Sequence, residues 1–141
     1  MTPFWKTWMT ATCATLSLLG LILAAAAFEA TDGPARLYFD LINGPGDLDL
    51  DPRMRFVLAV LGGVCIGWSI TLIATFTAAH ALSGEAATSV WRLTLVALVL
   101  WYVIDSALSV YTGFWLNAMI NTLFFGALLT PIIRSGVLRT S

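Results

Sequence analysis

The chain has 141 residues, of which 59% are hydrophobic and only 11% are charged, and its formal net charge is −1. A soluble domain carries about 25% charged residues, so most of the surface of so short and apolar a chain must face lipid. The near-neutral balance, without a lysine or arginine cluster, gives no electrostatic basis for binding nucleic acid.

Four apolar stretches approach or exceed the roughly 20 residues that a helix needs to cross a bilayer. They lie near residues 8–28, 54–79, 89–111 and 114–133. The sequence therefore predicts an all-α polytopic membrane protein, a single domain over residues 1–141 built as an up-down bundle of four transmembrane helices. The first stretch resembles a signal peptide, but its apolar run is longer than usual, so we expect it to remain as a span.

Residues 29–53, between the first two spans, predict an acidic extramembrane loop that contains six of the eight acidic residues. Within it, residues 35–42 combine apolar side chains with Arg36 and Asp40, a pattern that predicts a short interfacial helix. The Asp51-Pro52 pair then predicts the N-cap and first position of the second span.

The aspartates of this loop do not predict a calcium site. Asp47, Asp49 and Asp51 alternate with leucines. An EF-hand loop starting at Asp47 needs glycine at its sixth position and glutamate at its twelfth, and the sequence has Pro52 and Leu58 there. We therefore expect no metal.

Basic residues indicate the orientation of the spans. One side would hold four of them (Lys6, Arg92, Arg134 and Arg139) and the other three (Arg36, Arg53 and Arg55). Because cytoplasmic loops carry the excess of lysine and arginine, we expect both termini in the cytoplasm, in what we take to be a bacterial cytoplasmic membrane.

The third and fourth spans are separated by a very short turn at Gly113, which predicts a tight antiparallel hairpin. Polar residues recur at every fourth position on one helix face. At about 1.5 Å rise per residue, Asp105 and Asn121 both lie about 12 Å from the turn, whereas Ser109 and Asn117 both lie about 6 Å from it. The hairpin should therefore pair Asp105 with Asn121 and Ser109 with Asn117.

Asp105 is the most informative of these residues, because a carboxylate within a span costs roughly 2.5–3.5 kcal/mol on insertion scales. A neutral Asp105 donates to an amide carbonyl, and an ionised one accepts from Asn121 and from Ser109 or Ser106. Three interpretations stay open for this polar intramembrane cluster: an interhelical clasp, a proton or cation site, and a site for a polar ligand.

Small residues in the second span predict helix packing, because Ala59, Gly63 and Gly67 recur at four-residue spacing. Aromatic residues near the predicted interfaces predict an aromatic belt of Trp5, Trp8, Trp91 and Trp115.

His80 is the only histidine and lies where the second span ends. With Trp68 and Trp101 it is a candidate contact for a ligand or pigment, although a histidine without a ligand is the simpler interpretation. A single histidine excludes two-histidine haem ligation within the chain, and Cys13 and Cys65 form no CxxC motif, so we expect no cofactor.

The overall plan resembles the small bacterial four-helix membrane proteins of the DoxX-like type. The residues behind the resemblance are the Gly67-Trp68 pair and the repeat of Trp101, Asp105, Ser109, Gly113, Asn117 and Asn121. It implies a four-helix membrane bundle and transfers no activity.

The residues do not predict an enzyme, because the sequence has no Ser-His-Asp set, HExxH motif, glycine-rich phosphate loop or second intramembrane acid. Two functions remain: an accessory or assembly subunit of a larger membrane complex, and a small proton- or cation-coupled transporter or conduit centred on Asp105. The expected partners are membrane lipids and other membrane subunits or further copies of the chain.

Overall fold

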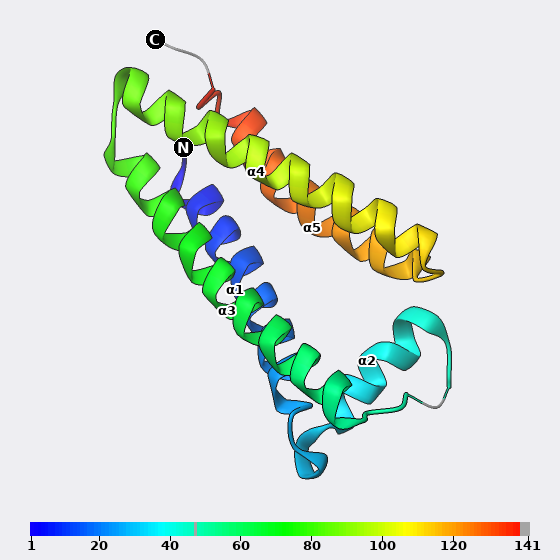
Figure 1. Cartoon of the computed structure of the whole chain (residues 1–141). Coiled ribbons are helices and arrows are strands. Elements are labelled where there is room, and N and C mark those ends of the chain that lie inside the picture. The colour runs from blue at the N-terminus through cyan, green and yellow to red at the C-terminus, as the bar shows by residue number, and fades with distance from the viewer. Residues whose placement is uncertain (47, 139–141) are drawn as a thin grey trace. The chain divides into compact units, whose positions relative to one another are not determined.

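The computed structural model describes residues 1–46 and 48–138 and shows a helical chain without strands over these residues (Figure 1). Its elements in chain order are α1 (Pro3–Ala25), the 3-10 turn η1 (Glu29–Thr31), α2 (Gly33–Asn43), α3 (Pro52–Ala81), α4 (Gly84–Tyr111) and α5 (Trp115–Arg134). The predicted all-α class is thereby confirmed.

Four of the helices, α1, α3, α4 and α5, are long and apolar enough to cross a membrane, which makes the chain an integral membrane protein. Two of them begin about a turn earlier than hydropathy predicts. α1 starts at Pro3, since proline suits the first turn of a helix. α4 starts at Gly84 rather than near residue 89, because good helix formers at Glu85 and Ala86 extend the helix beyond its apolar stretch.

The segment between α1 and α3 contains the helix predicted over residues 35–42, observed as α2. This helix buries Ala35 and Ile42 and exposes Leu37 and Leu41. The predicted N-cap of α3 is confirmed, because the Met54 backbone N–H donates to Asp51 Oδ1 at 2.7 Å. Asp47, part of the rejected calcium pattern, lies outside the described residues.

The chain divides into two compact units. Unit 1 consists of Met1–Thr12 and Thr71–Ser141, and unit 2 consists of Cys13–Ile70. In unit 2, α1 and α3 pack closely enough for Ser69 Oγ to donate to the Cys13 carbonyl at 2.6 Å. At the end of this unit, α2 and the segment just before α3 pack against α1 and α3. The buried cluster that they form consists of Leu23, Ala26, Ala35, Leu50 and Leu58.

Glycine makes the closest approach of α1 and α3 possible. A Cβ added at Gly20 would lie 2.7 Å from the Gly62 carbonyl oxygen, and one added at Gly62 would overlap the Ala24 backbone. At Gly63 or Gly67 an added Cβ would meet no described atom within 4 Å. Within this unit, α3 therefore turns Gly62 toward α1, and the packing role of Ala59, Gly63 and Gly67 stays a prediction.

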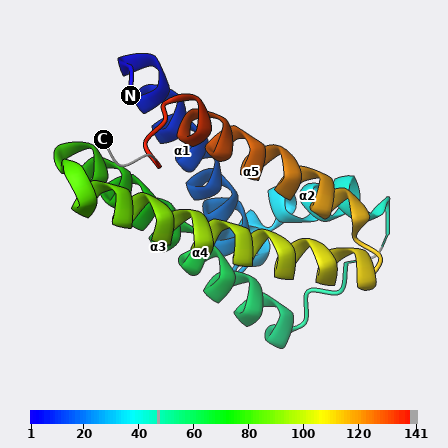
Figure 2. The same ribbon diagram turned by 90° about the horizontal axis from the view of Figure 1, so that it is seen from above.

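In unit 1, α4 and α5 form the predicted tight hairpin, and Figure 2 shows the two helices converging on their turn. Gly113 closes the turn at φ 91°, a conformation that glycine adopts without strain, and the Phe114 N–H donates to the Ser109 carbonyl at 2.8 Å. Further from the turn, the Tyr102 and Thr122 hydroxyls are 3.0 Å apart. These contacts fix the register of the hairpin.

Replacing Gly62 by alanine should lower the free energy of unfolding by about 1–3 kcal/mol, because the added methyl group forces the α1 and α3 backbones apart. The matched control is Gly63→Ala. It adds the same methyl group into open space and should be neutral or stabilising by up to about 1 kcal/mol. Unfolding in mixed detergent micelles, followed by circular dichroism, measures both. Equal effects of the two variants would show that Gly62 is not the contact.

Candidate functional site

The strongest intramembrane polar groups of the chain meet on the inner face of the α4–α5 hairpin. Asp105 and Ser109 lie one turn apart on α4, and Asn117 and Asn121 lie one turn apart on α5. Because the turn at Gly113 gives the two helices the same depth at matching positions, these four side chains come together. Ser109 and Asn121 are buried, whereas Asp105 and Asn117 are partly buried.

Three donors converge on one oxygen of the Asp105 carboxyl group. Asn121 Nδ2 donates to Asp105 Oδ1 at 2.8 Å, and Asn117 Nδ2 does so at 3.1 Å. Ser109 Oγ donates to the same oxygen, also at 3.1 Å. Asn117 Nδ2 lies in addition 2.9 Å from Ser109 Oγ. Both pairs predicted from depth, Asp105 with Asn121 and Ser109 with Asn117, are therefore in hydrogen-bond contact.

The second carboxyl oxygen, Asp105 Oδ2, has no hydrogen-bond partner among residues 1–46 and 48–138, and we call it the open oxygen. No lysine or arginine of the described chain forms an ion pair with Asp105. The site thus consists of one acid, three neutral donors and one vacant acceptor. It can bind a further hydrogen-bond donor, a cation or a proton at the open oxygen.

Ser106, the alternative donor considered from the sequence, does not take part. Its Oγ is buried and has no hydrogen-bond partner in the described chain. Ser109 is used instead because it lies four residues from Asp105, on the same helix face, whereas Ser106 is rotated away.

The three candidate ligand contacts have separate surroundings. The His80 ring meets the Trp91 ring edge to face at 5.1 Å, and the Trp101 ring meets the Phe124 ring in the same manner at 5.7 Å. Trp68 belongs to unit 2.

Trp91 is only 2% exposed, so its predicted place in an aromatic belt is wrong. It packs inside unit 1 because Phe76 stacks on it at 5.6 Å.

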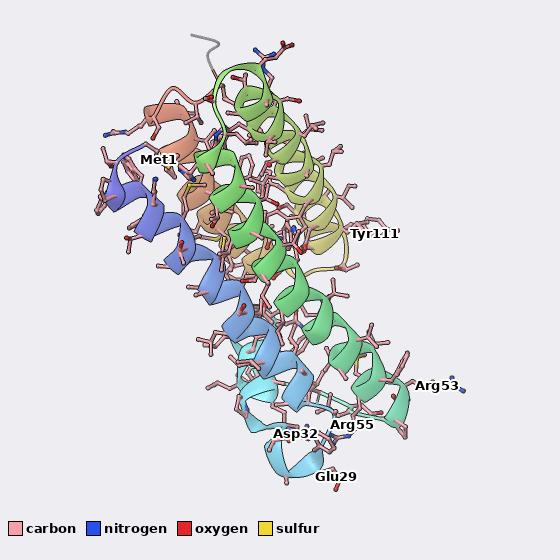
Figure 3. All side chains as sticks on the ribbon, turned by 90° about the vertical axis from the view of Figure 1, so that its left-hand side faces the viewer. Met1, Glu29, Asp32, Arg53, Arg55 and Tyr111 are labelled. Atoms are coloured by element: carbon pink, nitrogen blue, oxygen red, sulfur yellow. The ribbon has the colours of Figure 1, made fainter. Side chains whose placement is uncertain are left out.

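A second polar cluster, in unit 2, was not predicted from the sequence. Asp32 is buried and accepts from two guanidinium groups: from Arg36 at 3.1 Å and from Arg55 at 2.9 Å. Figure 3 shows Arg55 turned toward Asp32 while Arg53 points away. The spacing of Asp32 and Arg36 is the four-residue spacing of a helical ion pair, but no local pattern indicates Arg55.

The same two arginines tie the chain segments of this unit together. Arg55 Nη1 donates to the Ala26 carbonyl at 2.8 Å, and Arg36 Nη1 donates to the Leu48 carbonyl at 2.9 Å. The hydrogen bonds from Arg36 and Arg55 lower the pKa of Asp32 below its ordinary value. This cluster is satisfied on both carboxyl oxygens, which indicates a structural role.

Comparison with protein-family models, curated proteins and solved structures finds no match. The likeness to DoxX-like proteins stays a prediction. Among the described residues, no group of three or more histidine, cysteine, aspartate or glutamate side chains is arranged to hold a metal ion.

Replacing Asn121 by alanine should destabilise the hairpin by about 0.6–2 kcal/mol, the range for intramembrane polar pairs, because it removes the shortest bond to Asp105. Ser106→Ala is the control. It deletes a buried hydroxyl that has no partner and should leave stability unchanged or slightly higher. Thermal unfolding of both purified variants tests this, and a larger loss for Ser106→Ala would contradict the bonding described above.

The Asp32 cluster should make unfolding sensitive to acid. Because the folded-state pKa of Asp32 is lowered, its stabilisation is complete above the unfolded pKa of about 3.9 and is lost as the pH falls through the folded value. The stability difference between the natural chain and Asp32→Asn should therefore be largest near neutral pH and shrink below about pH 4. Unfolding curves across this range measure it, with Glu29→Gln, at an exposed acid of the same segment, as the matched acid-to-amide control. A pH-independent difference for Asp32→Asn would refute the assignment.

Proposed function

We propose that this chain is a non-enzymatic accessory or assembly subunit of a larger membrane complex, and that Asp105 is a contact point for its partner. The observation that supports this most directly is the open oxygen. The hairpin holds the carboxyl group with three hydrogen bonds to Oδ1 and leaves Oδ2 without a partner in the described chain. An acid within a span normally pairs with another group, and here that group would come from another membrane helix.

The chemistry of the site favours a donor from the partner. Carboxylate oxygens bind cationic donors more strongly than neutral ones, and the ligands of Oδ1 are all neutral amides or a hydroxyl. A lysine, arginine or protonated histidine in a partner span would supply such a donor to the open oxygen. The side chains around the acid suit a helix interface, because Ile104 and Leu108 are more than half exposed on α4.

The runner-up function is a small proton or cation conduit centred on Asp105. The same open oxygen favours it, since a carboxyl group with one vacant oxygen is able to take up and release a proton. A relay needs further groups that exchange protons, however, and the residues bonded to Asp105 are serine and two asparagines. These side chains orient the acid without changing their own charge near neutral pH.

The arrangement in the membrane belongs to the same proposal. We place the chain in a bacterial cytoplasmic membrane as an up-down bundle with both termini in the cytoplasm, supported by the four-to-three distribution of basic residues. The acidic segment of residues 29–53 then faces outward, with α2 at the interface. Its exposed Leu37 and Leu41 would enter the headgroup layer.

The proposal is tested by isolating the tagged full-length chain from its native membrane with Asp105 intact, as Asp105→Asn, and as the control Ser106→Ala. A stoichiometric membrane partner should accompany the natural chain and Ser106→Ala. Asp105→Asn should keep the hairpin folded, because the amide oxygen still accepts the three bonds. It should lose most of the partner, because the amide nitrogen replaces the open oxygen with a donor.

Purification without any stoichiometric partner would reject the subunit function. The conduit is tested separately on the purified chain in liposomes under a pH gradient. Flux that requires Asp105 and disappears in a folded Asp105→Asn would support the conduit in place of the subunit, whereas absence of flux together with partner loss would support the subunit.

A further inference from the structure

A pocket of about 270 Å³ lies in unit 1, between the first turns of α1 and the last two turns of α3. Its floor is apolar, formed by the buried side chains of Met9 and Phe76. Its polar lining includes Lys6, Thr10, Thr77 and His80. The volume is just below the roughly 300–1,000 Å³ of sites that enclose a whole small molecule, so the pocket suits part of a larger ligand.

The level of the pocket in the membrane follows from the helix ends. α1 begins at Pro3 and α3 ends at Ala81, which itself lines the pocket. Both helices therefore end within about two turns of the pocket. This places the pocket at the depth where lipid headgroups lie. Trp8, which is 44% exposed, supports this level because tryptophan is enriched at the membrane–water interface.

The charged part of the lining is purely cationic. Among the residues that the structure describes, Lys6 is the only charged side chain in the lining, and no aspartate or glutamate belongs to it. Lysine binds phosphate as a compact point charge, and basic pockets between membrane helices commonly hold anionic lipid headgroups. The charge therefore selects an anion, and the level of the pocket at the ends of two membrane-spanning helices favours one that belongs to a lipid.

The remaining polar groups present hydrogen-bond acceptors. Thr10 Oγ1 donates its hydrogen to the Lys6 carbonyl at 3.1 Å, and Thr77 Oγ1 donates to the Ile73 carbonyl at 2.8 Å, so each oxygen keeps its lone pairs for an incoming donor. His80 Nδ1 bonds to the Phe76 carbonyl. Since a carbonyl only accepts, Nδ1 carries the hydrogen, and in the neutral ring Nε2 is an acceptor as well.

The orientation of the imidazole is held by its neighbours. Trp91 touches its edge at 5.1 Å and an interplanar angle of 87°, and Met1 Sδ lies 3.0 Å from Nε2. A thioether sulfur only accepts hydrogen bonds, so the neutral ring makes no hydrogen bond to Met1, and a ligand hydroxyl that donates to Nε2 would replace this contact readily. Positive charge beside three acceptors matches a phosphate diester whose headgroup carries hydroxyl groups.

We propose that this pocket binds the headgroup of a glycerol-type anionic phospholipid, with Lys6 at the phosphate and with His80 and the two threonine oxygens at the headgroup hydroxyls. This site is independent of Asp105 and of the proposed subunit function.

The test measures binding to the purified full-length protein in detergent by native mass spectrometry. The probes are phosphatidylglycerol, phosphatidylcholine, which lacks net charge and headgroup hydroxyls, and water-soluble glycerol phosphate. Phosphatidylglycerol should bind saturably and more tightly than the other two. Lys6→Gln should weaken it about fivefold, the effect of one lysine near a membrane surface. Arg92→Gln, which removes an exposed cation of the same unit outside the pocket, should not change it.

Thr77→Leu provides a second variant that fills the pocket and leaves the charge unchanged, and it should also reduce phosphatidylglycerol binding. Equal binding of phosphatidylglycerol and phosphatidylcholine, or equal losses in Lys6→Gln and Arg92→Gln, would overturn the proposal. Glycerol phosphate binding as tightly as the lipid would overturn it as well, because the site would then recognise a soluble phosphate ester.

Discussion

A carboxyl group inside a membrane-spanning helix needs hydrogen-bond donors, and the three donors on Asp105 Oδ1 are the contact on which this structure depends most. They come from both helices of the hairpin, so they fix the depth of α5 against α4 at the same time as they hold the acid. Lipid offers no alternative partner for these groups. This cluster therefore sets the position of the candidate site, and together with the Gly113 turn and the Tyr102–Thr122 contact it fixes the register of the hairpin.

Asp32 and Asp105, the two acids at the centres of polar clusters, are stabilised in different ways. Asp32, outside the spans, meets two guanidinium groups that saturate both of its oxygens. Asp105 meets only neutral donors, and they occupy a single oxygen. The first arrangement is complete within the chain and explains how the segment before α3 is held. The second is incomplete, and that difference is why we assign function to Asp105 and structure to Asp32.

The two polar regions of unit 1 suit different ligands. At the hairpin, the chain presents a vacant acceptor on an acid, which suits a donor or a cation. Where α1 begins and α3 ends, Lys6 and His80 line a pocket that suits the headgroup of an anionic amphiphile. A membrane subunit that contacts both a partner helix and a lipid headgroup would use these sites without competition, because their charges are opposite.

The sequence by itself determined the helices, the four membrane spans and the pairing within the hairpin, because each depends on local patterns: apolar runs, four-residue spacing and equal distance from a tight turn. Only the tertiary structure decided which face each helix turns to its neighbour. It placed Gly62 rather than Gly63 against α1, buried Trp91, and brought Arg55 to Asp32 across 23 positions of the chain. These choices depend on packing between segments distant in sequence, and hydropathy and spacing carry no information about such contacts.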